Sequence, residues 1–179
     1  MTLSTFLNKQ VVIFCFLMMT CSTMLFAETQ HNRKGISNAW ELSPLILNDL
    51  NGKERNLYDW HGKVIMLNFW ATWCGPCQIE IPDFIKYQAQ YADKDLQIIG
   101  VGLDELRKLK NYARTVGINY PTLQADPELQ YSLLKQWGNP YGVLPFTVII
   151  ARDGHLVFMQ QGILDRQNFD TFVKPLLNK

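Results

Sequence analysis

The sequence predicts an α/β domain with a mixed sheet flanked by helices. Two nearly all-apolar runs, at 64–70 and 96–101, have the composition of strands that are buried on both faces. Segments with helical spacing follow these runs, and this alternation is typical of parallel strands joined by helices. An Asp153-Gly154 turn near the C-terminus predicts a hairpin that adds antiparallel strands.

The first half of the domain is expected to start with a hairpin. It runs from Leu45 to about Leu57, because Asn51-Gly52 is a strong turn signal between two short apolar stretches. After the first buried strand, apolar residues at helical spacing predict a helix over 75–91. Pro82 is expected to kink this helix, since proline removes one main-chain donor.

The second half continues the alternation of helices and strands. A helix is predicted over 105–116, and a further one is expected to open with Asp126 as its cap and Pro127 in its first turn. The remaining predicted elements are a strand over 143–150, a strand over 156–160 and a last helix capped by Asp165.

Length, charge and composition exclude several classes of protein. The chain has 179 residues, which suits one domain of roughly 100–200 residues. Its formal net charge is +1, so it lacks the basic excess of a nucleic-acid-binding surface. A hydrophobic share of 47% is enough to build a core, which excludes a disordered chain.

The N-terminus has the layout of an export signal. An uncharged apolar run at 11–27 follows Lys9 and precedes a polar stretch, whereas a buried core helix would carry polar residues on one side. We therefore divide the chain into a signal peptide or signal anchor (1–27), a linker (28–39) and a folded domain (40–179). A cleaved signal is favoured over an anchor, and the domain is expected in the periplasm or at the outer face of the cytoplasmic membrane.

Only two cysteines remain after the signal, Cys74 and Cys77. A disulfide between them closes a very short loop and gives little entropic stabilisation, so their expected purpose is chemical. Half of a zinc site is the alternative interpretation, but zinc needs four ligands. The histidines His31, His61 and His155 are scattered, so neither a metal nor another cofactor is predicted.

The pentapeptide at 73–77, Trp-Cys-Gly-Pro-Cys, lies between a buried strand and a helix start. Free N–H groups and the helix dipole at that position stabilise a thiolate, which makes Cys74 the expected nucleophile, exposed beside Trp73. Cys77 is expected to be more buried and to resolve the mixed disulfide. Gly75 allows a partner's main chain to approach, and Pro76 stiffens the helix start.

The stretch NFWATWCGPC, the proline five residues later, the LPFTVII segment and the closing Asp-Gly turn and helix together resemble the thioredoxin superfamily. The resemblance covers about 40–177. The N-terminal hairpin, the Trp60–Lys63 lead-in, the added length between 103 and 142 and Glu80 are similar to the TlpA/ResA-like branch. The branch implies a thioredoxin-like fold with an N-terminal hairpin and an inserted helix.

The resemblance also implies a role for Glu80. Ordinary thioredoxins carry a buried aspartate beneath the motif, where this chain has Asn68, and an amide does not titrate. In ResA-like proteins a glutamate matching Glu80 belongs to the active site. It lies three residues after Cys77, hence on the same helix face, and burial would raise its pKa. A solvated glutamate on the surface is the alternative.

A second implied feature is a cis-proline at Pro145 that faces the cysteines. The bend would leave the main chain of Leu144 available to an extended substrate strand. The alternative is a trans-proline that only starts a strand. Trp137 and Tyr141 precede this loop, and both substrate contact and plain packing are open for them.

Gly-Pro between the cysteines is the dipeptide of reducing thioredoxins, so the resemblance implies a reductase of protein disulfides. In an oxidising compartment it would need a membrane protein as electron donor, and we expect a monomer. Cytochrome c maturation is the best-known task of this branch. The stretch at 142–147 departs from the acidic, glycine-flanked stretch of the dedicated subgroup, which leaves a general reductase open.

Two functions of other classes remain as alternatives. A thiol peroxidase would need a Thr-x-x-Cys setting, and Thr72 is only two residues before Cys74. A non-catalytic binding or chaperone module would need dispensable thiols, whereas both cysteines stand in an intact motif.

Overall fold

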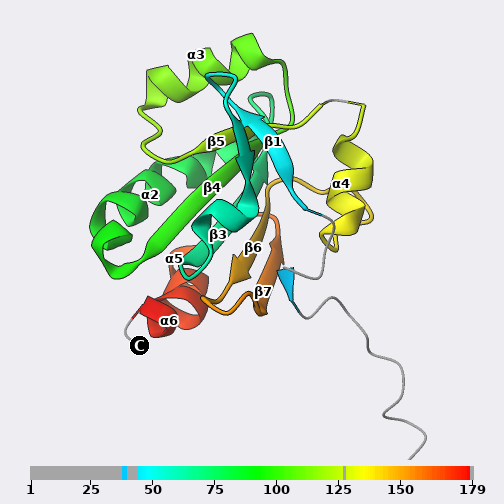
Figure 1. The fold of residues 1–179 in the computed structure, drawn as a ribbon. Helices are drawn as coiled ribbons and strands as arrows, with labels where there is room; N and C mark the ends of the chain where they lie inside the picture. Colours follow the sequence, from blue (N-terminus) through cyan, green and yellow to red (C-terminus); the bar gives the residue numbers. More distant parts are fainter. Residues whose placement is uncertain (1–37, 40–43, 127, 178–179) are drawn as a thin grey trace, which may run out of the picture. The chain divides into compact units, whose positions relative to one another are not determined.

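The computed structural model describes residues 38–39, 44–126 and 128–177. They contain a seven-stranded mixed sheet with the order β2-β1-β5-β4-β3-β6-β7 (Figure 1). The strands β3, β4 and β5 are parallel to one another, and the other neighbouring pairs are antiparallel, which confirms the predicted mixed sheet. The strands are β1 (Ile46–Asp49), β2 (Glu54–Asn56), β3 (Val64–Trp70), β4 (Leu96–Gly102), β5 (Thr122–Gln124), β6 (Phe146–Ile150) and β7 (Leu156–Gln161).

The helix predicted after the first buried strand forms with the expected bounds and contains Pro82. The final helix also forms, and the Asp165 side chain accepts the N–H of Asn168 as its cap. This final helical segment includes a π-helical turn at Phe169–Val173. The helices are η3 (Leu57–Trp60), α2 (Gly75–Tyr91), η4 (Ala92–Lys94), α3 (Leu106–Val116), α4 (Gln130–Gln136), α5 (Arg166–Asn168), η5 (Phe169–Val173) and α6 (Lys174–Leu177).

The residues of β3 alternate between the two faces of the sheet. Val64 and Met66 pack with Phe84 of α2 and with the C-terminal helical segment. Ile65 and Leu67 pack on the opposite face with the end of α4. Figure 1 accordingly shows α2 and α4 on opposite sides of the sheet. The whole of β3 is buried, as its apolar composition predicts.

The strand predicted over 143–150 is shorter in the structure. It begins at Phe146, because the preceding residues bend through a cis peptide bond between Leu144 and Pro145. The side chain of Asn139 occupies the hydrogen-bonding groups of Val143, as its Nδ2 donates to the Val143 carbonyl (2.7 Å) and its Oδ1 accepts the Val143 N–H (3.1 Å). These groups are therefore not available to the sheet.

The prediction of a helix that opens at Asp126 was wrong. The Asp126 carboxylate accepts the N–H of Glu128 at 2.9 Å in a turn, and α4 begins only at Gln130, without a side-chain cap. Pro127 lies outside the described residues. The sequence pattern therefore marked the turn before the helix. Both α3 and α4 lie within the 103–142 segment for which an inserted helix was expected.

The predicted linker ends earlier than residue 39. Asn38 forms a β-bridge with His155, and Ala39 is buried and donates its N–H to the Gly154 carbonyl at 2.8 Å. The apolar packing of the domain therefore includes Ala39. The expected signal or anchor at 1–27 and the rest of the linker, 28–37, lie outside the described residues. No helix in the described part is long and apolar enough to cross a membrane.

Candidate active site

The two cysteines lie where β3 ends and α2 begins, and they form a disulfide bond. Cys74 is the N-cap residue of α2, and its Sγ accepts the N–H of Cys77 at 3.3 Å. Free N–H groups and the positive end of the helix dipole stabilise negative charge at this position. The geometry therefore favours a thiolate on Cys74 once the disulfide is reduced.

Cys74 and Cys77 differ less in solvent exposure than the sequence predicted. Cys77 is fully buried as expected, but Cys74 is only 5% exposed, so the prediction of an exposed Cys74 was wrong for the disulfide form. Both cysteines pack in an apolar cluster that includes Trp70 and Leu109. The exposed part of the motif is its rim, because Trp73 is 67% exposed and Gly75 and Pro76 are also exposed.

Glu80 is buried behind the cysteines on α2, with 2% exposure. Its Oε1 accepts a hydrogen bond from Asn68 Nδ2 at 2.7 Å, and its Oε2 accepts the main-chain N–H of Leu164 at 2.9 Å. Burial raises the pKa of Glu80 from 4.5 to about 7, although both hydrogen bonds oppose this shift. Glu80 can therefore exchange protons near neutral pH.

Asn68 holds Glu80 from the sheet side. Its Nδ2 also donates to Thr147 Oγ1 at 2.9 Å, and Asn68 and Thr147 are direct neighbours in the ladder between β3 and β6. Thr147 and Leu164 were not expected at the site from the sequence. A signal for Thr147 was present, since it is a polar residue inside an otherwise apolar strand, as Asn68 is. The Leu164 contact is made by the main chain and leaves no such signal.

The Leu144–Pro145 peptide bond is cis, as the resemblance implied. Leu144 is half-buried and packs against the apolar cluster that contains both cysteines, so this loop adjoins the disulfide. Its main chain makes no hydrogen bond to any residue that the structure describes. These N–H and C=O groups are thus free to pair with an extended chain.

Substrate contact and plain packing were both possible for Trp137 and Tyr141, and the structure distinguishes the two residues by their exposure. Trp137 is 1% exposed and belongs to the core, whereas Tyr141 is 84% exposed beside the Leu144 loop. Tyr141 therefore offers exposed aromatic surface three residues before Leu144.

Polar contacts also fix the loop that precedes Cys74. The hydroxyl of Thr72 donates to the carboxylate of Asp104, and Gln78 Nε2 donates to the Thr72 carbonyl at 2.7 Å. Asp104 was not singled out from the sequence. The hydroxyl of Thr72 is engaged in this contact, which adds to the spacing argument against a Thr-x-x-Cys peroxide site.

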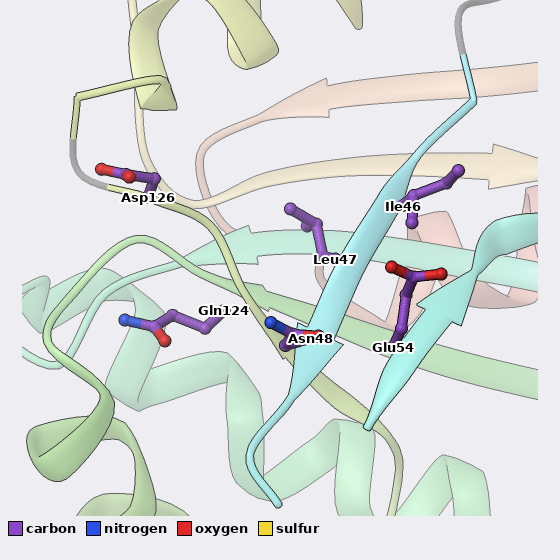
Figure 2. A pocket seen from close by; sticks show the side chains of 6 residues that line it. All are labelled: Ile46, Leu47, Asn48, Glu54, Gln124 and Asp126. Atoms are coloured by element: carbon purple, nitrogen blue, oxygen red, sulfur yellow. The ribbon is translucent and has the colours of Figure 1, made fainter. Parts of the chain in front are cut away.

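A pocket of about 380 Å³ opens elsewhere, at the edge formed by β1, β2 and the end of β5 (Figure 2). Its lining residues are Ile46, Leu47, Asn48, Glu54, Gln124 and Asp126. None of them belongs to the cysteine site. Within the described part of the chain, no three His, Cys, Asp or Glu side chains gather to hold a metal ion.

The fold and the cysteine site define a protein of the thioredoxin-like class. Residues 41–159 match the AhpC/TSA family, and the chain belongs to this family. A solved structure with the same fold is a thioredoxin-family thiol:disulfide interchange protein from Chlorobium tepidum TLS. It superimposes with a TM-score of 0.68 at 28% identity and covers 80% of this chain and 99% of its own.

Relatives of this chain include thiol-disulfide oxidoreductases called ResA. ResA from Bacillus subtilis (strain 168) is 28% identical in an alignment of 172 positions, which covers 92% of this chain and 89% of ResA. ResA from Bacillus anthracis is 29% identical over 137 residues, or 76% of each chain. Fold, cysteine pair and relatives together place this chain among thiol-disulfide oxidoreductases of the ResA type.

Proposed function

We propose that this protein is an exported reductase of protein disulfides that works through a Cys74–Cys77 dithiol/disulfide cycle. The observation that carries the proposal is the cysteine pair at the N-terminus of α2 with the buried Glu80 carboxyl behind it. The relatives named as thiol-disulfide oxidoreductases support it.

The first step is attack by the Cys74 thiolate on a substrate disulfide. A bond forms between Cys74 and one substrate sulfur, and the other substrate sulfur leaves as a thiolate and takes up a proton. The N–H groups of the first turn of α2 stabilise the attacking charge. The surface offered by Trp73 and the free main chain of Leu144 suit an extended substrate segment.

In the second step Cys77 resolves the mixed disulfide. Its thiol must lose a proton before the sulfur attacks Cys74; the substrate sulfur bonded to Cys74 then leaves as a thiolate and takes up a proton from solvent. We assign the acceptor role to Glu80, because it is buried on the same helix face and its pKa is about 7. When the disulfide is reduced again, Glu80 returns the proton.

The Gly75-Pro76 dipeptide motivates the reducing direction. We expect a reduction potential nearer to thioredoxin's value of about −270 mV than to about −120 mV for a strong periplasmic oxidant. Equilibration with glutathione buffers measures it, and a value close to that of the oxidant would overturn the direction. The apolar run at 11–27 supports export, and a membrane thiol-reductant protein is the proposed donor. Reduction of apocytochrome c cysteines is one task that this chemistry fits.

Substrate trapping tests the proposal. Cys77→Ser leaves Cys74 free to attack but removes the resolving sulfur, so mixed disulfides should accumulate on Cys74 and be released by dithiothreitol. The matched control is the Cys74→Ser/Cys77→Ser double variant, which should trap nothing. Absence of trapped protein in the single variant, together with no reduction of insulin disulfides by the parent, would contradict the proposed activity.

A further inference from the structure

The outer face of α3 carries a row of positive side chains. Arg107, Lys110 and Arg114 are exposed and follow one another at spacings of three and four residues, which places them on one side of the helix. Leu109 is fully buried and marks the side of α3 that packs on the domain. Arg114 also donates to the neutral Asn111 amide at 3.4 Å. We call Arg107, Lys110 and Arg114 the α3 cation row.

Neighbouring acids do not neutralise the α3 cation row. Among the residues that the structure describes, no carboxylate forms an ion pair with the row. By contrast, Lys108 pairs with Glu105 at 2.7 Å and lies 3.6 Å from Asp104. The stretch 106–125 contains no Asp or Glu, although the whole chain has 17 basic and 16 acidic residues. The row is therefore a local concentration of positive charge on a nearly neutral chain.

Helix stability does not account for the row. Arg107 is the second residue of α3, and a cation in the first turn of a helix opposes the helix dipole. The neighbouring Lys108 is compensated by its two acidic partners, Asp104 and Glu105. Arg107 has no acidic partner in the described part of the chain. Its position indicates a role outside the helix.

The start of α3 adjoins the cysteine site. β3 and β4 are parallel neighbours, and α2 and α3 follow their carboxyl ends, so both helices begin at the same edge of the sheet. Leu109 packs in the apolar cluster that contains both cysteines. The hydroxyl of Thr72, two residues before Cys74, donates to the carboxylate of Asp104, which directly precedes this helix turn. A protein that docks on the disulfide therefore lies next to α3.

We propose that the α3 cation row binds an acidic segment of the protein substrate, next to the disulfide that Cys74 attacks. The inference rests on the proposed function and names the substrate class for the same site. Opposite charges raise the rate of encounter and orient the two proteins, but they take no part in the exchange of disulfides. The row residues are therefore determinants of specificity and not catalytic residues.

A protein partner fits the row better than a lipid surface. Helices that lie on membranes expose large apolar side chains beside their charges. The fully exposed residues of α3 are all polar, and its apolar residues are buried or half-buried against the domain. The charge of the row is thus available, but an apolar anchor for the lipid is missing from this helix.

Peptide disulfides that differ only in a flanking tri-glutamate, tri-glutamine or tri-lysine segment test the proposal. Stopped-flow fluorescence measures the second-order rate constant of their reduction by the reduced protein. At about 0.01 M salt, where the Debye length is about 30 Å, the parent should reduce the acidic peptide about five- to twentyfold faster than the basic one. At about 1 M salt the Debye length is about 3 Å, and the difference should fall to within about twofold.

The row variant Arg107→Gln/Lys110→Gln/Arg114→Gln removes the charges and keeps good helix-forming residues. At low salt its rate with the acidic peptide should fall by about fivefold, which is a modest part of the range of electrostatic steering. Its rate with the tri-glutamine peptide should stay within about twofold of the parent, because the disulfide chemistry is untouched.

The matched control is Lys53→Gln/Lys63→Gln/Lys94→Gln, which changes the net charge by the same amount. Lys63 and Lys94 lie just before β3 and β4, and Lys53 lies in the turn between β1 and β2. All three are therefore at the edge of the sheet opposite to the cysteines. The control should keep the preference for the acidic peptide to within about twofold.

Equal rates of the parent with all three peptides at low salt would overturn the proposal. A row variant that keeps the preference, or a control that loses as much of it, would also overturn it. So would row-dependent sedimentation with vesicles of anionic phospholipid in the absence of a peptide preference, which would assign the row to a membrane surface.

A binding measurement separates this inference from the proposed function. A parent that reduces none of the peptides would refute the reductase activity. Fluorescence anisotropy of the same peptides with serine in place of cysteine then decides on the row alone. We expect the parent to bind the acidic peptide about three- to tenfold more tightly than the row variant does at low salt, and equal affinities would overturn the assignment of the row.

Discussion

The two faces of β3 are equally buried but chemically different. Ile65, Leu67 and Phe69 face a core of apolar side chains from η3, α4 and β6. On the other face, Asn68 interrupts the apolar series and joins Glu80 to the sheet. One face therefore stabilises the fold through the burial of apolar side chains, whereas the other face also contains buried polar and titratable groups. Four of the five unpartnered buried polar atoms in the described residues lie on that second face.

The largest expected effect comes from the apolar face. Phe69 is fully buried between Trp137 and Phe146, with ring centroids at 6.2 Å and 5.7 Å. Phe69→Ala should lower the free energy of unfolding by about 3–5 kcal/mol, as a large core cavity does. Denaturant titration measures this loss. The folded variant should keep the parent's pH profile of Cys74 alkylation, and a changed profile would show that the faces are not separate.

The pH dependence of stability should be dominated by the polar face. The pKa of Glu80 in the folded state, about 7, lies above its ordinary value of 4.5. The stability contributed by its protonated form is therefore complete below pH 4.5 and is lost as the pH rises to about 7. Across this window the oxidised parent should lose about 3 kcal/mol more than Glu80→Gln. Parallel stability curves for the two proteins would contradict this account.

Glu80→Gln should also slow catalysis while it preserves the shape of the site. We expect reduction of insulin disulfides to fall by roughly ten- to a hundredfold, the low end of general acid–base effects. The pH profile of Cys74 alkylation should simplify, because the thiol then titrates without a coupled carboxyl. An unchanged rate and profile would mean that the proton of Cys77 travels by another path.

Two neighbouring residues of β6 give the smallest and most local comparison. Thr147 faces Asn68, whereas Val148 is in the apolar core of the other face. Thr147→Val removes one hydrogen bond and should cost about 1 kcal/mol of unfolding free energy. Val148→Thr buries a hydroxyl without a partner and should cost about 1–3 kcal/mol. Denaturant titration measures both losses of unfolding free energy. Equal losses would contradict the chemical difference between the two faces.

Sequence reasoning predicted the elements with strong local signals. The runs at 64–70 and 96–101 became central strands, and helical spacing gave α2 its bounds. It failed where a tertiary contact overrides a local pattern. The Asp126 carboxylate stabilises a turn and does not cap a helix. The Asn139 side chain is hydrogen-bonded to the main chain of Val143, which therefore does not pair in the sheet. The strand β5, with three residues, is too short to leave a periodic signal.

The candidate site was predictable in part for the same reason. The cysteines and Glu80 stand close together in the sequence, so their shared helix could be inferred from spacing. The exposure of Cys74 could not, because it depends on the packing of Trp70 and Leu109 around the disulfide. The Leu164 N–H that holds Glu80 comes from a segment 84 residues away and uses only main-chain atoms. No side-chain pattern encodes such a contact.

We propose the buried Glu80 carboxyl as the proton-exchanging group of the polar face. Carbon-detected NMR titration of the oxidised protein tests it most directly, with the Glu80 signal assigned by its absence in Glu80→Gln. We expect a midpoint at about pH 7, because burial outweighs the hydrogen bonds from Leu164 and Asn68. A midpoint near the ordinary value of 4.5 would contradict it.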